Sequence, residues 1–383
     1  MKKTLVCIVN DEVVRNYLFV VEMFREGDEV MLVSAHRMKE DAKRLEKALP
    51  VPPESVSHIV LRHDYDEEVW DVMCRTLREG LSQEGRYCVN LSGGTRFMAL
   101  AVQTVFSEFH SLFFFVPPTR NLVIHSMIDG NNDNNDDTLA PIGHRMSVEE
   151  YLGIHGLKTT VKHLTQSAEY TNHFFSLFVG GYFSDNDFAV LDLMRSYRNT
   201  DRLDIAKVEH LPKSTERRPR VPHLAQLLRF VHFPCQKEGY LNKDEIQYIT
   251  GGWFEEYVYR KIKDDINPDD IQLGVCVQRP GSSISNDLDV AFTLGNKLFV
   301  AECKTGVKGT SLFHQIVYKA SALHEALLGT SSNSAICSLS SDYGDQLTSM
   351  AWGMDIYYCD RDYFTNPKQW QKYVDKVLKR ANG

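Results

Sequence analysis

The sequence lacks several features that would assign it to a common class of protein. None of its apolar runs approaches the roughly 20 residues that a membrane-spanning helix needs. The apolar run near Met1 ends at Asn10, too soon for a secretory signal. There is no GxGxxG motif and no Walker lysine, so sites of the NAD or ATP type are poorly supported. We therefore expect a cytoplasmic protein with no membrane partner.

The eight cysteines also lack a functional pattern. They form no CxxC pair and have no histidine at zinc-ligand spacing, and several stand in strand-like runs, where a reduced cysteine acts as a small apolar residue. An excess of positive charge is missing too, because the formal net charge is -8 at pH 7. A polyanion such as nucleic acid would therefore have to be held by a local basic groove or through a bound metal ion.

What is present indicates two α/β domains. The chain has 383 residues, of which 43% are hydrophobic and 25% charged, an ordinary globular balance for more than one core. We predict an N-terminal domain over 1–145, a helical connecting region over 146–235 and a C-terminal domain over 236–383. In the C-terminal domain a helix, a run of strands, a long helix over 312–328 and a strand over 356–359 indicate a mixed α/β fold.

The N-terminal domain alternates apolar strand-like runs with helical stretches. Continuously apolar strands separated by helices are typical of a parallel sheet covered on both faces, so we predict a Rossmann-like fold. Its last two strands, around 113–115 and 122–125, should form an antiparallel hairpin at the edge. The expected strands are 4–9, 29–33, 57–61, 87–91 and 111–116, with helices over 13–24, 37–49, 67–81 and 96–109.

Two polar segments interrupt the middle of the chain. The tract 131–137 (NNDNNDD) predicts a loop or linker. The segment 213–222 (KSTERRPRVP) is basic and punctuated by proline, and either connects two elements or contacts nucleic acid.

In the C-terminal domain, 286–294 (NDLDVAFTL) and 297–304 (KLFVAECK) flank Gly295-Asn296, which predicts a β-hairpin with a two-residue turn. With Leu294 opposite Lys297, the apolar residues share one face, which belongs in the core. The pairs on that face are Val290–Ala301, Phe292–Phe299 and Leu288–Cys303.

The other face of the hairpin sets Asp289 against Glu302. Like charges at opposed positions are destabilising, so such a pair indicates a cation between them or a protonated carboxyl group. Mg²⁺ and Mn²⁺ prefer a few carboxylates plus water and substrate phosphate. Lys304 projects on the same face, where an ammonium can orient water and stabilise phosphate charge. The alternative is a surface hairpin with a Glu–Lys pair and an incidental aspartate.

A helix upstream of the hairpin supplies a further acid. On a helical wheel, Phe254, Val258 and Ile262 form the buried stripe, and Glu255 falls at its edge, where it can reach inward. Glu256 falls on the far side as an ordinary solvent-face charge, with Arg260 as its i,i+4 partner.

Asp289, the E-x-K element from Glu302 to Lys304 and the helical Glu255 resemble the PD-(D/E)xK, or restriction-endonuclease-like, nucleases. Leu288 stands where the proline of that name would be. The resemblance implies that Asp289, Glu302, Lys304 and Glu255 are catalytic. It also implies that Asp289, Glu302 and the backbone carbonyl of Cys303 bind Mn²⁺ or Mg²⁺ for phosphodiester hydrolysis.

In the N-terminal domain the strand over 87–91 runs into Ser92-Gly93-Gly94-Thr95-Arg96 and then a helix. Two glycines let backbone N–H groups approach a ligand, and Thr95 can cap a helix whose N-terminus attracts anions. Arg96 adds a bidentate donor. The first strand ends similarly, at Asn10-Asp11, and ligands of open parallel sheets lie beyond such strand ends. A plain, well-capped strand–helix turn is the alternative.

The segment 90–98 (NLSGGTRFM), on a Rossmann-like domain of this length, resembles the CARF sensor domains of type III CRISPR systems. Those domains bind cyclic oligoadenylates, usually between the two copies of a homodimer. The resemblance implies that a cyclic oligoadenylate, expected to be the tetra-adenylate, activates the C-terminal nuclease. It further implies a pocket lined by Asn10, Asp11, Ser92, Gly93, Gly94, Thr95 and Arg96.

The resulting hypothesis is a cyclic-oligoadenylate-activated, metal-dependent endonuclease of antiviral defence. Its expected substrates are DNA, single-stranded or nicked within a duplex, and single-stranded RNA. One alternative is a ligand-gated nucleic-acid-binding regulator with a vestigial nuclease domain. Another is a restriction-like enzyme that needs no messenger.

Overall fold

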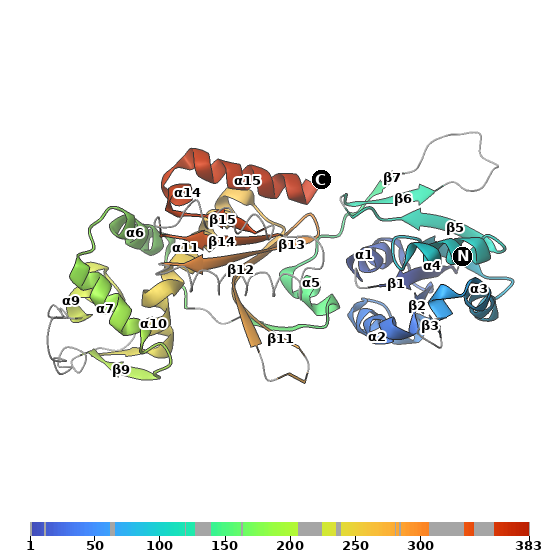
Figure 1. Ribbon diagram of the computed structural model, residues 1–383, viewed down its shortest axis with the longest axis horizontal. Helices are drawn as coiled ribbons and strands as arrows, with labels where there is room; N and C mark the ends of the chain where they lie inside the picture. The colour runs from blue at the N-terminus through green and yellow to red at the C-terminus, as the bar shows by residue number, and fades with distance from the viewer. Residues whose placement is uncertain are drawn as a thin grey trace.

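The computed structural model of the chain describes residues 2–10, 13–61, 66–118, 120–126, 139–161, 164–205, 224–234, 239–279, 281–282, 285–305, 333–340 and 356–382. Two sheets lie side by side, each with helices packed on it, and helix α5 (Val148–Ile154) lies between them (Figure 1). Predicted segments 131–137, 213–222 and 312–328 fall outside the described residues. Within the described part of the chain, no helix is long and apolar enough to cross a membrane.

The N-terminal sheet has seven strands in the order β3-β2-β1-β4-β5-β6-β7. The first five in this order pair in parallel, and β6 and β7 add an antiparallel edge. The predicted Rossmann-like sheet and its edge hairpin are therefore confirmed. The strands are β1 (Thr4–Val9), β2 (Glu29–Ser34), β3 (Val56–Val60), β4 (Arg86–Asn90), β5 (His110–Phe115), β6 (Leu122–Ser126) and β7 (Leu139–Pro141).

Helices cover both faces of this sheet because the strand residues alternate between two apolar clusters. Leu5 and Cys7 of β1 pack with helices α1 and α2, whereas Val6 and Ile8 pack with α3 and α4. All four of these strand residues are fully buried. The helices are α1 (Val13–Met23), α2 (Lys39–Ala48), α3 (Trp70–Glu79) and α4 (Arg96–Phe106), with short 3-10 turns at His36–Met38, Pro53–Ser55 and Asp66–Glu68.

The C-terminal sheet has six strands in the order β15-β14-β13-β12-β11-β8. Strands β8, β11, β12 and β13 pair antiparallel, and β13, β14 and β15 pair in parallel. This mixed sheet agrees with the predicted α/β domain. Its strands are β8 (Lys158–Val161), β11 (Asp270–Gln278), β12 (Ser285–Leu294), β13 (Lys297–Lys304), β14 (Ser334–Ser338) and β15 (Tyr357–Cys359).

Helix α11 (Trp253–Ile266) packs on this sheet through the predicted stripe of Phe254, Val258 and Ile262, all fully buried. The region predicted as a connector joins the same core: Phe174 of α6 stacks on Trp253, with ring centroids 4.3 Å apart. Strand β8 of that region also extends the sheet. The remaining elements are α6 (Ala168–Val179), α7 (Asp185–Arg195), β9 (Arg202–Asp204), α9 (Leu224–Phe230), β10 (Tyr240–Asn242), α10 (Lys243–Gln247), the π-helical Tyr248–Gly252, α14 (Arg361–Thr365) and α15 (Pro367–Asn382).

The two domains share an apolar cluster at their junction. Ala291 and Leu298 of the β12–β13 hairpin are fully buried in the cluster that also holds Leu5 and residues of α1 and α5. Burial of apolar side chains contributes roughly 25 cal/mol per Å² of area removed from water. The junction is therefore a packed interface, and the hairpin touches both domains.

Candidate functional site

The β12–β13 hairpin has the predicted register from its turn to the pair of Val290 and Ala301. The predicted pairs beyond that point, Leu288–Cys303 and Asp289–Glu302, are not part of the ladder. Val290 pairs with Ala301, Phe292 with Phe299 and Leu294 with Lys297. The turn residues Gly295 and Asn296 both have φ of 59°, the left-handed region that a two-residue hairpin turn of type I′ requires. The hairpin and its two-residue turn are thus confirmed.

The prediction of one apolar face was wrong in part. Both faces are covered, because the second face meets the N-terminal domain through Ala291 and Leu298. Leu288 packs in that cluster rather than with Val290. The alternation of side chains between the two faces of β12 is therefore interrupted at Asp289. In the pairing of β12 with β11, Asp289 stands level with Gly274, whose φ is 65°.

At its open end the hairpin brings the three predicted polar side chains together. The Asp289 carboxylate accepts a hydrogen bond from the backbone N–H of Cys303 at 2.7 Å. Lys304 Nζ lies 3.2 Å from Asp289 Oδ2 and 2.7 Å from Glu302 Oε1. The side chains of Asp289 and Glu302 are only 14% and 10% exposed. Two carboxylates and an ammonium thus converge in a largely desolvated space.

The carboxylates in this space repel one another. Burial, together with the charges of Glu255 and Glu302, raises the pKa of Asp289 to about 8, against the opposing effects of Lys304 and the Cys303 N–H. Burial alone would lower the pKa of Lys304, but Asp289 and Glu302 raise it above its ordinary value. Repulsion among carboxylates at a buried site is what a divalent cation would relieve.

Glu255 lies half-buried in the first turn of α11 and acts electrostatically on Asp289, the inward position that the helical wheel predicts. The prediction for Glu256 was wrong, because its side chain is fully buried. Glu256 does pair with Arg260, with Nη2 and Oε1 2.5 Å apart. It also accepts hydrogen bonds from Tyr248 Oη and the Gln166 N–H, both at 2.8 Å. Because these partners come from other segments and enclose its carboxylate, Glu256 is a buried structural side chain and not a surface charge.

Sequence reasoning missed Arg198, which follows α7. Its Nε donates to Thr250 Oγ1 at 2.8 Å, in the middle of the π-helical segment before α11. Desolvation lowers the pKa of Arg198, and the charges of Glu255 and Asp289 oppose that effect. The guanidinium therefore belongs to the same electrostatic group as the acids. In the sequence, the only feature that could have drawn attention to Arg198 is a second arginine, Arg195, three residues before it.

The donor set fits a hard divalent cation held by few protein ligands. Among the described residues, no three His, Cys, Asp or Glu side chains are grouped so that they could hold a metal ion. The ligands would be the carboxylates of Asp289 and Glu302, with water completing the shell as Mg²⁺ prefers. The Cys303 carbonyl accepts from Lys304 Nζ at 3.0 Å, so it lies beside the same ammonium.

At the other predicted site, the two glycines are sterically required. A Cβ on Gly93 would lie 1.8 Å from the Ile8 carbonyl oxygen. Gly94 has φ of 73°, and a Cβ there would lie 2.4 Å from Ile8 Cγ2. Thr95 caps α4 as predicted, accepting from the Met98 N–H at 3.1 Å. The loop is therefore fixed directly against the end of β1.

Buried polar side chains hold that loop in place. Asn16 Nδ2 donates to the Ile8 carbonyl at 2.8 Å, and Asn90 Nδ2 donates to Asn16 Oδ1 at 2.9 Å. The Ser92 hydroxyl donates to Asn90 Oδ1 at 2.6 Å and accepts from the Val116 N–H at 2.6 Å. Ser92 thus acts within the network, as a positioning residue for the loop.

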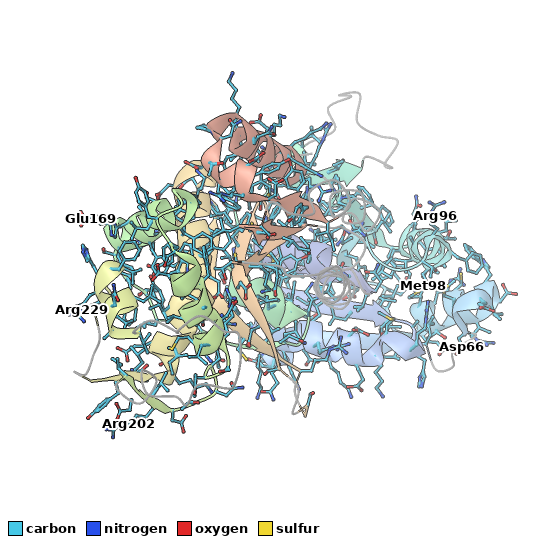
Figure 2. The ribbon with its side chains drawn as sticks, turned by 60° about the vertical axis from the view of Figure 1, so that its left-hand side comes forward. Asp66, Arg96, Met98, Glu169, Arg202 and Arg229 are labelled. Carbon is cyan, nitrogen blue, oxygen red and sulfur yellow. The ribbon has the colours of Figure 1, made fainter. Side chains whose placement is uncertain are left out.

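Two of the other predicted ligand residues, Asn10 and Arg96, lie in the described part of the chain. Within the described residues, the Asn10 Oδ1 atom is buried with no hydrogen-bond partner. Arg96 is exposed, and Figure 2 shows it at the end of the molecule opposite Glu169, Arg202 and Arg229. Asp11 lies outside the described residues. The structure therefore brings an acceptor, a cation and a glycine loop to one edge of the sheet.

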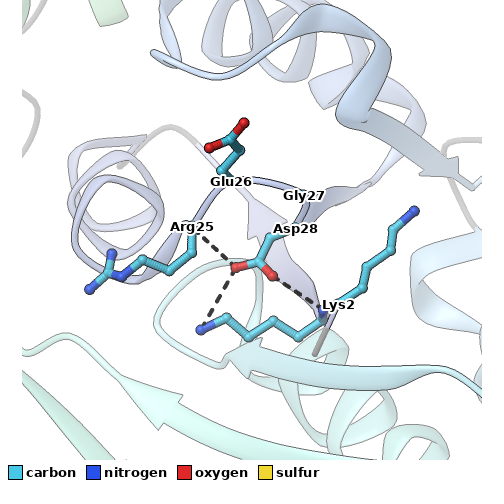
Figure 3. A pocket seen from close by; sticks show the side chains of 6 residues that line it. Lys2, Arg25, Glu26, Gly27 and Asp28 are labelled. Carbon is cyan, nitrogen blue, oxygen red and sulfur yellow. Dashed lines mark hydrogen bonds and ion pairs between the residues drawn. The ribbon is translucent and has the colours of Figure 1, made fainter.

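A hollow of about 280 Å³ lies at the opposite edge of that sheet, where β1 and β2 begin (Figure 3). Its floor is Asp28, which accepts from the Arg25 N–H at 3.0 Å and the Lys3 N–H at 3.3 Å. These hydrogen bonds stabilise the turn between α1 and β2. The shape of that turn therefore accounts for the hollow. It is lined by Lys2, Lys3, Arg25, Glu26, Gly27 and Asp28.

Comparisons with known proteins match both domains. A family model described as "Card1 CARF domain" matches residues 4–151, and one described as "Card1-like, endonuclease domain" matches residues 242–354. Comparison with curated protein sequences gives no match.

Three solved structures resemble the chain. Protein VC1899 from Vibrio cholerae has a TM-score of 0.73 at 17% identity, covering 100% of this chain and 99% of that one. Can2 from Sulfobacillus thermosulfidooxidans, in complex with cyclic tetra-adenylate, has a TM-score of 0.67 at 21% identity, with both chains covered completely. A type III CRISPR defence DNA nuclease activated by cyclic oligoadenylate has a TM-score of 0.50 at 14% identity, covering 88% of this chain and 45% of that one. At these identities the structures show a common fold.

Proposed function

We propose, from the matches of its two ends to a Card1 CARF domain and a Card1-like endonuclease domain, that the chain is a metal-dependent endonuclease activated by a cyclic oligoadenylate. Its role would be in type III CRISPR defence. The observation that carries the nuclease assignment is the convergence of Asp289, Glu302 and Lys304 at the open end of the hairpin.

Each residue of this group has a chemical role in the proposal. Asp289, Glu302 and the Cys303 carbonyl would hold Mn²⁺ or Mg²⁺, which supplies positive charge for the phosphate and acidifies the attacking water. Lys304 keeps its proton, because its pKa is raised. Its ammonium therefore orients the water and stabilises charge that develops on the phosphate. Glu255 adds a further carboxylate beside Asp289.

The activator would bind at the glycine loop of the CARF domain. Its phosphates meet the N–H groups of Gly93 and Gly94 at the N-terminus of α4, with Arg96 as counter-charge. The unpartnered Asn10 Oδ1 offers an acceptor for an adenine amino group. The CARF family match supports this site, as does the complex of Can2 with cyclic tetra-adenylate. Cyclic tetra-adenylate is therefore the activator to test first.

A homodimer would complete this pocket. Helix α4 begins at the loop and exposes two large apolar side chains, Phe97 at 40% and Leu100 at 55%. Their position beside Arg96 lets a second copy cover the apolar face and close over the ligand. Light scattering should give twice the chain mass for the unmodified protein, and Leu100→Glu should give a monomer. A monomeric unmodified protein would contradict this part of the proposal.

The nuclease assignment can be tested with purified protein, Mn²⁺ and labelled single-stranded DNA, RNA and supercoiled plasmid, each with and without cyclic tetra-adenylate. We expect cutting of DNA that depends on the activator, with RNA tested as a second substrate. Glu302→Ala should abolish cutting and retain activator binding. Binding of nucleic acid without any cut strand would favour a regulator, and equal cutting without activator would favour a messenger-independent enzyme.

A further inference from the structure

Arg198 is held in a fixed position beside the acids. Thr250 Oγ1 donates to the Ile246 carbonyl at 2.7 Å and accepts from Arg198 Nε at 2.8 Å, so its hydroxyl has both roles filled. A Cβ on Gly251 would lie 2.5 Å from Arg198 Nη2 and 3.9 Å from Glu255 Oε1. The glycine therefore leaves room for the guanidinium next to the helix that carries Glu255.

Arg195, one turn earlier, reaches the other side of the same site. Its Nη2 donates to Thr305 Oγ1 at 3.1 Å, and Thr305 directly follows Lys304. It also pairs with Asp192 on its own helix. Arg195 thus lies at the end of β13, whereas Arg198 lies at the start of α11.

The formal charges of this site balance once Asp289 is ionised. Asp289, Glu302 and Glu255 then carry three negative charges, and Lys304, Arg195 and Arg198 carry three positive ones. A divalent cation would leave the group positive, which favours a phosphodiester. Guanidinium groups bind phosphate with two parallel hydrogen bonds, a geometry that an ammonium cannot supply.

We propose that Arg195 and Arg198 bind backbone phosphates of the nucleic acid strand on either side of the scissile bond. The proposal rests on the proposed nuclease function. It assigns substrate binding to the last residue of α7 and the segment that follows it, which lie outside both matched family models. The recognised chemistry is the phosphate backbone, so binding should be independent of sequence.

The test measures binding of a fluorescent single-stranded oligonucleotide by anisotropy, in a Glu302→Gln background with Mn²⁺ and cyclic tetra-adenylate. Arg198→Ala and Arg195→Ala should each weaken binding by about 10- to 100-fold, the range for hydrogen bonds to charged groups. Each should reduce the slope of log affinity against log salt by about 0.7, the value for one phosphate contact on a single strand. Arg198→Lys should restore the slope and only part of the affinity. Arg229→Ala, an exposed arginine on α9, is the matched control.

Two failures are distinguishable. If both alanine variants keep the salt slope of the parent protein, or lower only the unfolding midpoint, the two arginines are structural and the proposal is overturned. If Glu302→Gln alone still cuts nucleic acid, the proposed catalytic site itself is wrong.

A separate observation concerns the turn of the hairpin, which is buried. Asn296 is only 4% exposed. Its Oδ1 accepts from the Met146 N–H at 2.9 Å, and its Nδ2 donates to the His144 carbonyl at 3.0 Å and to Asn121 Oδ1 at 3.1 Å. We call Asn296 with these three partners the turn clamp. Asn121 stands next to β6 of the CARF domain, so the clamp joins the two domains directly.

The clamp is connected in turn to helix α1. The His144 N–H donates to Glu22 Oε1 at 2.7 Å, and Tyr17 Oη donates to Glu150 Oε1 at 2.7 Å. Asn16 of the same helix donates to the Ile8 carbonyl at 2.8 Å, against which Gly93 of the activator pocket packs. A continuous set of contacts therefore runs from the activator pocket through α1 to the hairpin that carries the acids.

We infer that the turn clamp transmits activator binding to the catalytic end of the hairpin. This inference also rests on the proposed function, and it requires that the clamp differ between the free and bound states. Asn296→Gly removes the amide and keeps the positive φ of the turn. Asn267→Gly, at a second asparagine with φ of 52° that is exposed, is the matched control.

The measurement is the ratio of cutting rates with and without saturating cyclic tetra-adenylate. Asn296→Gly should lower this ratio by about 5- to 150-fold, the usual range of allosteric coupling, while calorimetry still detects activator binding. Asn267→Gly should keep the parent ratio. An unchanged ratio in a folded Asn296→Gly protein overturns the inference, whereas an unmodified protein that ignores the activator refutes the proposed function instead.

Discussion

The two ends of the β12–β13 hairpin have opposite physical characters. At the turn end, the Gly295 N–H donates to the Asp269 carboxylate at 2.7 Å, and the Asn296 amide has three neutral partners. At the open end, 5 ladder pairs away from the turn, carboxylates crowd together and the pKa of Asp289 is raised to about 8. The same two strands therefore carry one satisfied end and one strained end.

This comparison shows which parts of the structure hold the mutually repelling carboxylates in place. Buried like charges cost stability, and they persist only where the surrounding structure fixes them. Here the turn end, the apolar ladder and α11 hold the strands, so the acids cannot separate to relieve repulsion. The polar partners of the Asn296 amide come from the CARF domain, so the turn end is held by the sensor.

The largest effect is expected from a comparison of two lysines on one strand. Lys304→Ala at the open end should lower the cutting rate by about 10²- to 10³-fold, as for loss of a preorganised charge in other enzymes. Lys297→Ala at the turn end removes a bond from Nζ to the Arg380 carbonyl and should change the rate little. Rates under single-turnover conditions measure this, and equal losses would remove the functional distinction between the ends.

The next effect is on cation affinity as a function of pH. A metal ligand must be deprotonated, so affinity for Mn²⁺ should rise about tenfold per pH unit up to the Asp289 pKa of about 8, and level off above it. Calorimetric titrations at several pH values measure this. In Asp289→Asn the slope should disappear, and a flat profile in the unmodified protein would contradict the raised pKa.

At the turn end, Gly295→Ala should destabilise the protein by about 1–3 kcal/mol, because a left-handed backbone is costly for residues with a Cβ. The added atom would also lie 2.7 Å from the Ala381 carbonyl oxygen. Gly281, with φ of 81° and no atom within 4 Å of its Cβ position, is the control for backbone strain alone. Urea unfolding distinguishes the two, and an equal loss would show that the turn is not enclosed.

The last prediction is a gain in the stability of the metal-free protein rather than a loss. The folded pKa of Asp289 is raised above its ordinary value of 3.8, so ionisation destabilises the metal-free fold increasingly as pH rises from about 4 to about 8. Asp289→Asn cannot ionise and should stabilise the metal-free protein at pH 8, and not at pH 4. Thermal unfolding in EDTA measures this. A destabilised variant at pH 8 would mean that the carboxylate is favourable where it stands.

Short-range pattern predicted much of this site. The hairpin register next to the turn, Thr95 as a cap and the buried stripe of α11 depend on neighbours along the chain, and all are confirmed. What failed depends on distant partners. Glu256 is buried because Tyr248 and Gln166 donate to it, and Arg198 joins the acids from another segment. The second face of the hairpin is covered by a separate domain, which no periodicity within the strand can indicate.

The central claim is that Asp289 and Glu302 surround a divalent cation, and calorimetry with Mn²⁺ tests it most directly. The account predicts one site per chain, weakened at least about 100-fold in Glu302→Gln. Affinity should be unchanged in Glu245→Gln, a control at a buried glutamate that caps α10. Equal Mn²⁺ affinity in the unmodified and Glu302→Gln proteins would contradict the account.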